Sequence, residues 1–138
     1  MKRILFITIV TILLLSFSMQ ASAETEIRTK EVTPMWTNIM NISAYLSIDS
    51  SGTATCSSDL IQSLSDGSSA LVINLQKLNS GKWSTIATWT KIGSIECSNI
   101  AYEDVAEGTY RLSVTGKVYN SLGVLTETAT IYSTTKTY

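Results

Sequence analysis

Histidine is absent from the whole chain of 138 residues. Without it, the Ser-His and Cys-His arrangements of nucleophilic enzymes cannot form, and the commonest zinc ligand is missing. An enzyme would have to work with carboxylates, and a metal site would have to be built from acidic side chains. We therefore expect a protein that is not an enzyme and that uses neither a cofactor nor a metal ion.

Basic residues are also few, and they form no patch. The chain has 10 Lys and Arg against 11 Asp and Glu, and Lys2 and Arg3 stand at its very start. Affinity for nucleic acids rests largely on cationic contacts with phosphates. The charge pattern therefore argues against a nucleic acid as partner.

The start of the chain, residues 1–23, has the pattern of a secretory signal peptide. A mostly apolar run, residues 4–19, follows the two basic residues and ends before a small-residue cleavage site, Ala21-Ser22-Ala23. The alternative is an uncleaved membrane anchor, which needs about 20 apolar residues. The run is short for that, and no second apolar run follows. We expect a secreted, extracellular protein without a membrane span after signal cleavage.

The expected mature chain, residues 24–138, has 115 residues, which suits one domain with one core. Ser and Thr make up 34 of these residues, and such a composition favours strands and turns over helices. Apolar and polar residues alternate in about seven runs, which are separated by turn residues. We predict an all-β fold, a single immunoglobulin-like antiparallel β-sandwich in residues 41–138. An irregular arm, residues 24–40, would precede it.

The clearest alternation flanks a turn at residues 120–123. A four-residue turn there would pair Val114 with Ala129. It would also place Glu127, the one inward carboxylate, opposite Gly116, which leaves room for it. The inward faces of the two strands would carry Tyr110, Leu112, Val114 and Val118 in the first and Leu125, Ala129 and Ile131 in the second.

Earlier turns predict further registers. The first pairs Ile48 with Ala54 and Leu46 with Cys56, so that Cys56 points inward. A later segment, residues 92–102, changes the parity of its apolar residues, which predicts a strand that breaks near residues 98–99.

A third hairpin would pair Leu78 with Trp83 and Leu75 with Ile86. That register places Trp83 and Trp89 on the outer face of the sheet. Either a bulge returns Trp89 to the core, or the outer face carries an apolar stripe that needs a partner.

The two cysteines allow only one disulfide within the chain, between Cys56 and Cys97. Both are expected on inward faces of neighbouring strands. Closing the loop between them would stabilise the domain by roughly 4 kcal/mol on the chain-entropy estimate. The alternative is a pair of buried free thiols.

Tyr110 follows a corner formed by residues 104–109, at the start of the sixth predicted strand. In immunoglobulin-like sandwiches, a tyrosine at this position sends its hydroxyl back to an upstream backbone group. We interpret Tyr110 as a structural residue of this corner.

The chain resembles a family of small, uncharacterised secreted proteins of Gram-positive bacteria. The family has no assigned activity, so the resemblance implies a fold and export but no functional residues. One departure is that residues 59–64 are more acidic and apolar than the family pattern. The matching pieces are Leu75-Gln76-Lys77, Gly81-Lys82-Trp83, Trp89, Gly108-Thr109-Tyr110-Arg111, Val118-Tyr119, Gly123, Thr126-Glu127-Thr128 and Ser133.

Carboxylates offer two candidates for chemistry. Glu127, on an apolar face, could have a raised pKa and act as an acid in a hydrolase, but a structural group bonded to backbone or to Tyr hydroxyls is the more ordinary reading. Glu96, Glu103, Asp104 and Glu107 could hold calcium, although they lack the spacing of a dedicated loop and fit a solvated corner better.

The outer face of the last hairpin is the best candidate surface for binding. There Arg111 would lie opposite Tyr132, in a row of Thr and Ser pairs, and the Trp83 and Trp89 stripe could serve the same end. A plain solvent face rich in Thr is the other reading. The leading hypothesis is a non-enzymatic module that binds an unknown protein or a cell-envelope or glycan polymer. The alternatives are a secreted antagonist, bacteriocin-like or an inhibitor, and a carboxylate-dependent hydrolase.

Overall fold

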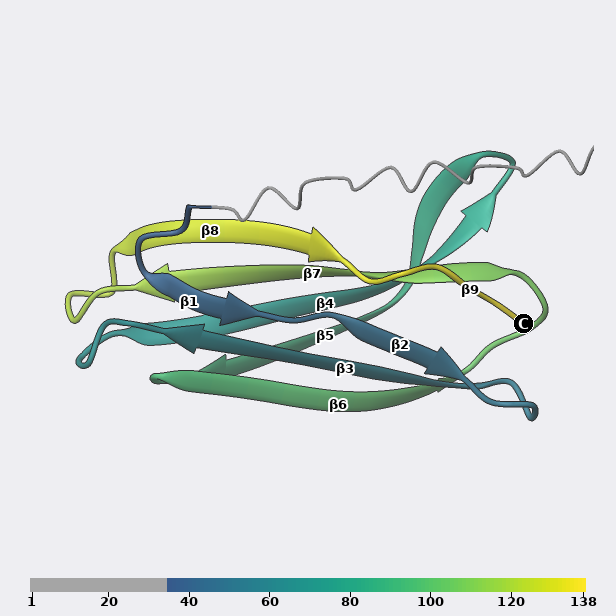
Figure 1. Cartoon of the computed structure of the whole chain (residues 1–138), viewed down its shortest axis with the longest axis horizontal. Helices are drawn as coiled ribbons and strands as arrows, with labels where there is room; N and C mark the ends of the chain where they lie inside the picture. Colours follow the sequence, from purple (N-terminus) through teal and green to yellow (C-terminus); the bar gives the residue numbers. More distant parts are fainter. Residues whose placement is uncertain (1–34) are drawn as a thin grey trace, which may run out of the picture. The chain divides into compact units, whose positions relative to one another are not determined.

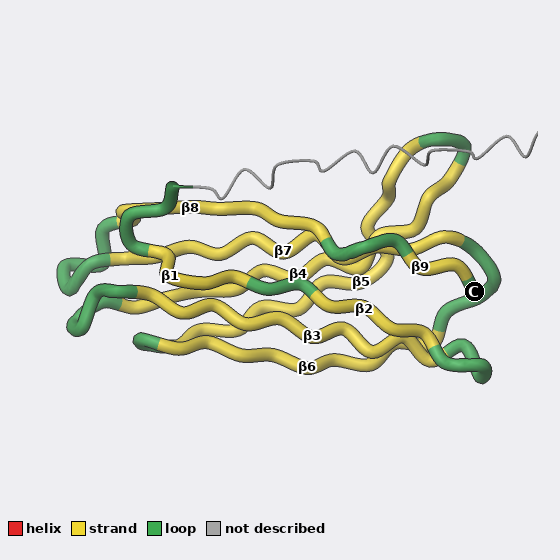
Figure 2. The backbone as a smooth tube through the Cα atoms, in the orientation of Figure 1, coloured by secondary structure: helices red, strands yellow, loops and turns green. Residues whose placement is uncertain are grey.

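A computed structural model describes residues 35–138, so the expected signal peptide and most of the arm lie outside the described residues. Within them the protein is all-β, and its strands form two antiparallel sheets packed face to face (Figures 1 and 2). The strands are β1 (Ile39–Ile42), β2 (Tyr45–Ile48), β3 (Thr53–Gln62), β4 (Ser68–Asn79), β5 (Lys82–Gly93), β6 (Glu96–Asp104), β7 (Thr109–Tyr119), β8 (Leu125–Tyr132) and β9 (Lys136–Thr137).

One sheet has four strands, with β1 and β2 on one side of β3 and β6 on the other. The predicted pairs Ile48 with Ala54 and Leu46 with Cys56 are both present. Between β1 and β2 the ladder is interrupted at Ser43, whose hydroxyl donates to the carboxylate of Asp59 and accepts from its backbone N–H. β1 and β2 are therefore one strand with a polar interruption.

The other sheet has five strands in the order β5-β4-β7-β8, with β9 added beside β7. Counting β1 and β2 as one strand and setting aside the two-residue β9 gives seven strands. Three of them lie in one layer and four in the other, and the chain crosses between layers after β3, β5 and β6. This is the predicted immunoglobulin-like sandwich, in which β5, the fourth strand of this count, belongs to the five-stranded sheet.

The core lies between the layers and is supplied by every second residue of the long strands. Leu112 and Val114 of β7 are fully buried, Ala129 of β8 is nearly so, and Ile131 packs against them. Gly116 lies opposite Ala129, and a Cβ there would come within 2.9 Å of Ile42 Cδ1. The room at Gly116 thus admits apolar side chains of the facing sheet.

The register of the last hairpin differs from the prediction by two residues. Val114 pairs with Ile131, and Glu127 lies opposite Val118 rather than Gly116. Two local features account for the difference. The pairing extends as far as Asn120 and Val124, so the loop has three residues instead of the expected four. A bulge near the start of β8 adds one further residue to that strand. From Glu127 to Ile131 the side chains keep their predicted faces, because a shift of two preserves parity. Leu125 was predicted inward, but it lies before the bulge, opposite Tyr119, and is 49% exposed.

β6 corrects the prediction of a broken strand. It runs without interruption from Glu96 to Asp104 and pairs with β3 along its whole length. Cys97 and Ala101 point into the core, so Ile100 and Tyr102 alternate outward and are exposed. The apolar residues change face along this segment because Ile100 and Tyr102 point outward, and not because the strand breaks.

The β4–β5 hairpin begins in the predicted register, with Leu78 opposite Trp83. A bulge then shifts the pairing, so that Leu75 meets Ala87 rather than Ile86, and Trp89 lies opposite Ile73. Trp89 consequently turns to the inner side and packs against the core. The end of this hairpin bends out of the two layers (Figure 1).

Tyr110 lies at the start of β7, just after the corner, and only 1% of its surface is exposed. Its hydroxyl donates a hydrogen bond to the backbone carbonyl of Ala106, four residues upstream. Lys77 Nζ lies 5.4 Å from the centre of the ring. This bond ties the crossover between the sheets to the first residues of β7.

The predicted disulfide is wrong. Cys56 and Cys97 are both buried and both face the core, but each is a free thiol. Cys97 pairs with Leu60, four residues along β3 from Cys56. Four residues of a strand span about 13 Å, whereas the Cα atoms of a disulfide lie within about 7 Å. Inward parity was therefore right for both cysteines, but their positions along the strands keep them apart.

Burial raises the pKa of the Cys56 thiol to about 12, with a further contribution from the charge of Glu103. Burial also raises the pKa of Cys97, whose thiol donates to the carbonyl of Lys91. We expect two alkylated cysteines after treatment with iodoacetamide in denaturant without reductant, read by intact mass. The melting temperature should not change with reductant. A mass corresponding to no alkylation would contradict this account.

Candidate functional site

Three side chains meet on the outer face of the five-stranded sheet and form what we name the arginine stack: Trp83 of β5, Arg111 of β7 and Tyr132 of β8. The guanidinium carbon of Arg111 lies 4.3 Å from the centre of the Trp83 ring and 4.2 Å from that of Tyr132. A cation placed over aromatic faces is attracted by their quadrupoles. The arginine is thus held between two rings.

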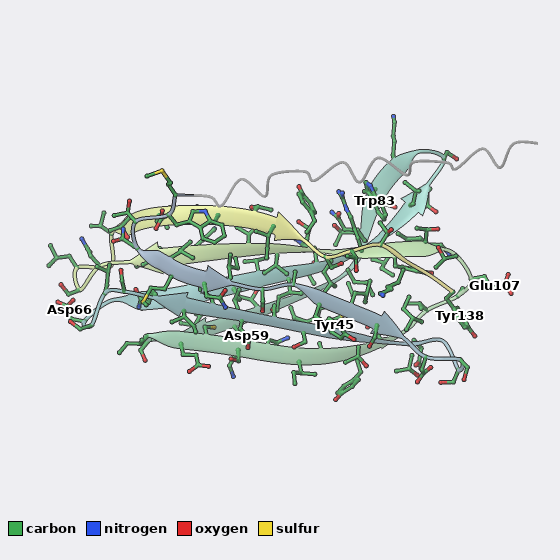
Figure 3. The ribbon with its side chains drawn as sticks, in the orientation of Figure 1. Tyr45, Asp59, Asp66, Trp83, Glu107 and Tyr138 are labelled. Carbon is green, nitrogen blue, oxygen red and sulfur yellow. The ribbon has the colours of Figure 1, made fainter. Side chains whose placement is uncertain are left out.

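The strands bring the stack together in an indirect way. Tyr132 pairs with Ser113, not with Arg111 as predicted, so the arginine reaches it along the diagonal. Gln76 is the residue of β4 that lies directly opposite Arg111, and its Oε1 accepts a hydrogen bond from Arg111 Nε at 2.9 Å. Trp83 lies on the end of the β4–β5 hairpin that bends out of the layers (Figure 3).

The chemistry of the stack follows from what Arg111 still offers. Its one side-chain hydrogen bond within the described residues goes to the neutral amide of Gln76. The two terminal nitrogens keep a planar fork of donors that suits carboxylates, phosphates and vicinal hydroxyls. Tyr132, 55% exposed, adds a ring face beside that fork. The stack can therefore hold a polar or anionic group against an aromatic surface.

Trp89 does not belong to this surface. The bulge in β5 turns it to the inner side, where it packs against the core. Of the four side chains predicted as a binding surface, the structure brings together Trp83, Arg111 and Tyr132 and separates Trp89 from them.

A second exposed surface lies on the outer face of the four-stranded sheet. Tyr45, Ile100 and Tyr102 have 62%, 62% and 66% of their surface exposed. Tyr45 and Ile100 flank Ser57 on its two sides, and Tyr102 flanks Thr55. Sequence reasoning missed this surface. The signal was the outward parity of Ile100 and Tyr102, which was interpreted as a strand break.

Glu127 binds backbone and not a substrate. Its carboxylate accepts hydrogen bonds from the N–H groups of Thr37, Asn38 and Ile39, at 2.9, 2.6 and 2.8 Å. Burial raises the pKa of Glu127, and these three bonds lower it by more, so the pKa lies below its ordinary value. A carboxylate that stays ionised and has its lone pairs occupied is poorly suited to act as a general acid.

The acidic residues do not gather into a metal site. Glu96 stands at one end of β6, whereas Glu103, Asp104 and Glu107 lie at or just after the other end, so Glu96 is separated from the other predicted calcium candidates. Among residues 35–138, no group of three or more His, Cys, Asp or Glu side chains is placed to hold a metal ion. No helix in this part of the chain is long and apolar enough to cross a membrane.

Comparisons with protein-family models, with curated proteins and with solved structures each find no match for this chain. The resemblance to a family of secreted Gram-positive proteins therefore stays a prediction.

Proposed function

We propose that the protein is a secreted, non-enzymatic module that binds an extracellular protein or a cell-envelope glycan through the arginine stack. The observation that carries the proposal is the guanidinium of Arg111, held between Trp83 and Tyr132 and oriented by Gln76, with its outer donors unused by the described part of the chain. Trp, Tyr and Arg are the residues that most often dominate binding energy at interfaces.

The position of the stack supports this role. Arg111 and Tyr132 lie on strands of the five-stranded sheet, and Trp83 reaches them from the protruding β4–β5 hairpin (Figure 3). Around the stack the sheet presents uncharged polar side chains, among them Thr115 and Thr130, whose hydroxyls lie 2.9 Å apart. Such a surface offers hydroxyls and ring faces to a glycan or to a polar protein surface, and it needs no metal ion to do so.

Binding to cell envelopes and to culture-fluid proteins of the producing organism tests the proposal. The purified protein should cosediment with an envelope fraction or capture a soluble partner. Trp83→Ala combined with Tyr132→Ala should weaken this binding at least tenfold, because each ring contributes about 1 kcal/mol or more to a stacked contact.

Thr128→Ala is the matched control, because Thr128 is an exposed residue of β8 on the same face. It should bind as the wild type does. Both variants should keep the wild-type circular dichroism and melting temperature to within a few degrees. Undiminished binding by the folded double variant would refute a role for the stack.

A further inference from the structure

Charge is divided between the two layers of the sandwich. All basic residues of the described part lie on strands of the five-stranded sheet: Lys77, Lys82, Lys91, Arg111, Lys117 and Lys136. The acidic residues lie on strands of the four-stranded sheet or in the loops that follow them, with the single exception of Glu127. Glu127 is already bound to three backbone N–H groups. The two sheets therefore carry opposite charge.

Part of this charge points outward, on the faces that solvent reaches. On the four-stranded sheet, Asp59, Glu96 and Asp104 alternate with buried residues and so lie on the outer face. We name this the acidic face, and it also carries the exposed Tyr45, Ile100 and Tyr102. Figure 3 labels Tyr45 and Asp59 on it.

The outer face of the five-stranded sheet carries positive charge. Arg111 and Lys117 of β7 alternate with the buried Leu112 and Val118 and point outward. No free carboxylate accompanies them on the strands of this sheet within the described residues. We name this the basic face, and the arginine stack lies at one end of it.

Within residues 35–138, the charged side chains of both faces that form hydrogen bonds have only neutral partners. Asp59 accepts from the hydroxyl of Ser43, and Asp104 accepts from that of Thr53. Arg111 donates to the amide of Gln76. An external group of opposite charge would therefore meet no competing ion pair at any of these side chains.

The two faces also match in spacing. Asp104 lies opposite Thr53, and Asp59 is six residues further along β3, which is about 20 Å in the strand direction. Arg111 and Lys117 are likewise six residues apart on β7, again about 20 Å. The two carboxylates on the acidic face and the two cations on the basic face are therefore separated by the same distance along their strands.

We infer that the acidic face of one copy of this chain docks on the basic face of another. A second copy is the occupant that accounts for both faces at once, since it supplies each sign at the required spacing. The exposed aromatic and apolar side chains of each face would be covered in the same contact. Because the two faces are different surfaces on opposite sides of one domain, the contact is heterologous and leaves both outer faces free to continue.

The expected affinity is low. A face of three or four strands, about 4.8 Å apart and about eight residues long, covers roughly 400–500 Å². Burying two such faces stays below the roughly 1,200 Å² of a standard stable interface. Association should therefore be reversible, dependent on protein concentration, and weakened by salt, which screens exposed charges.

Sedimentation velocity of the purified protein at low ionic strength tests this inference. The weight-average sedimentation coefficient should rise with concentration in the wild type and fall to the monomer value in about 0.5 M NaCl. Two charge-reversed variants should each remain monomeric: Arg111→Glu with Lys117→Glu, which makes both faces acidic, and Asp59→Lys with Asp104→Lys, which makes both faces basic.

An equimolar mixture of the two reversed variants should associate again, because each then meets a face of opposite sign. Lys82→Glu, at the first residue of β5, and Asp66→Lys, in the β3–β4 loop, are controls outside both faces and should associate as the wild type does. If a double variant fails to fold, Lys117→Glu and Asp104→Lys give the same comparison with one change each.

Three results would overturn the inference. The wild type could stay monomeric at all concentrations in low salt, or the mixture of the two reversed variants could fail to associate. The third result is that the faces bind an added polycation or polyanion but not a second copy of the chain. Binding to the envelope is read separately, with the Trp83 and Tyr132 variants. Undiminished envelope binding by those variants, with self-association of the wild type intact, would refute the proposed function only.

Discussion

Replacing Tyr110 with alanine is expected to lower the free energy of unfolding by about 3–5 kcal/mol, the cost of truncating a fully buried aromatic side chain. The whole stability of a domain this size is about 5–15 kcal/mol. Tyr110 is the largest of the fully buried side chains, and it also holds the corner between β6 and β7 through its hydroxyl. Urea unfolding followed by tryptophan fluorescence would measure the loss.

Tyr110→Phe separates the hydroxyl from the ring. It keeps the buried ring and removes only the hydrogen bond to the Ala106 carbonyl, so we expect a loss of about 1–2 kcal/mol. Tyr102→Phe is the matched control, because Tyr102 is 66% exposed on the neighbouring strand β6, and it should change stability by less than about 0.5 kcal/mol. Equal midpoints for Tyr110→Phe and the wild type would show that the hydroxyl does not hold the corner.

Alternation of apolar and polar residues was enough to predict the fold class and the inner face of most strands. It also predicted the pairing of Ile48 with Ala54, because a short turn leaves little choice of register. In the last hairpin it could not fix the register, since a shift of two residues leaves the side chains of residues 127–131 on their predicted faces. The shift depends on the Asn120 loop and a bulge in β8, and neither changes the pattern.

The same limit explains the wrong disulfide. Alternation says that Cys56 and Cys97 point inward, but it says nothing about how far along the neighbouring strands they lie. Only the pairing of Cys97 with Leu60 shows that the sulfurs are held apart. A pattern with a period of two carries no information about position along the strand.

The binding surface was predicted in part for a similar reason. Arg111, Trp83 and Tyr132 have outward parity on three strands of the same sheet, and the structure brings them together. The face on which Trp89 lies depends on a bulge in β5, and the alternation of residues could suggest that bulge but not establish it. Tyr45 and Tyr102 were overlooked as a surface because neighbours on adjacent strands are far apart in sequence, and only the pairing of β2, β3 and β6 brings them to one face.

Removing the carboxylate of Glu127 is expected to release the start of β1. Glu127→Ala deletes the acceptor of three N–H groups, and we expect it to cost about 2 kcal/mol, toward the lower end for hydrogen bonds to a charged group because the site is partly exposed. Glu127→Gln keeps one acceptor oxygen and should cost about 1 kcal/mol. The backbone amides of Asn38 and Ile39 should exchange faster with deuterium in both variants, and amides in the middle of β7 should not.

The pH dependence of stability gives an independent test with a definite sign. Because the pKa of Glu127 is lowered in the folded state, its contribution is fully present above the ordinary glutamate pKa of about 4.3. It is lost as the pH falls through the lowered pKa of the folded state. The stability difference between the wild type and Glu127→Gln should therefore be constant near neutral pH and shrink in acid.

Asp49 makes the comparison with Glu127→Gln necessary. Hydrogen bonds from the Ser51 hydroxyl and from the backbone N–H groups of its own turn also lower the pKa of Asp49, so the wild type loses stability in acid from two carboxylates. Subtracting the variant cancels Asp49 and leaves Glu127. A difference that stays constant through the acid range would mean that the arm is held by contacts other than the Glu127 carboxylate, such as the packing of Trp36 against the core.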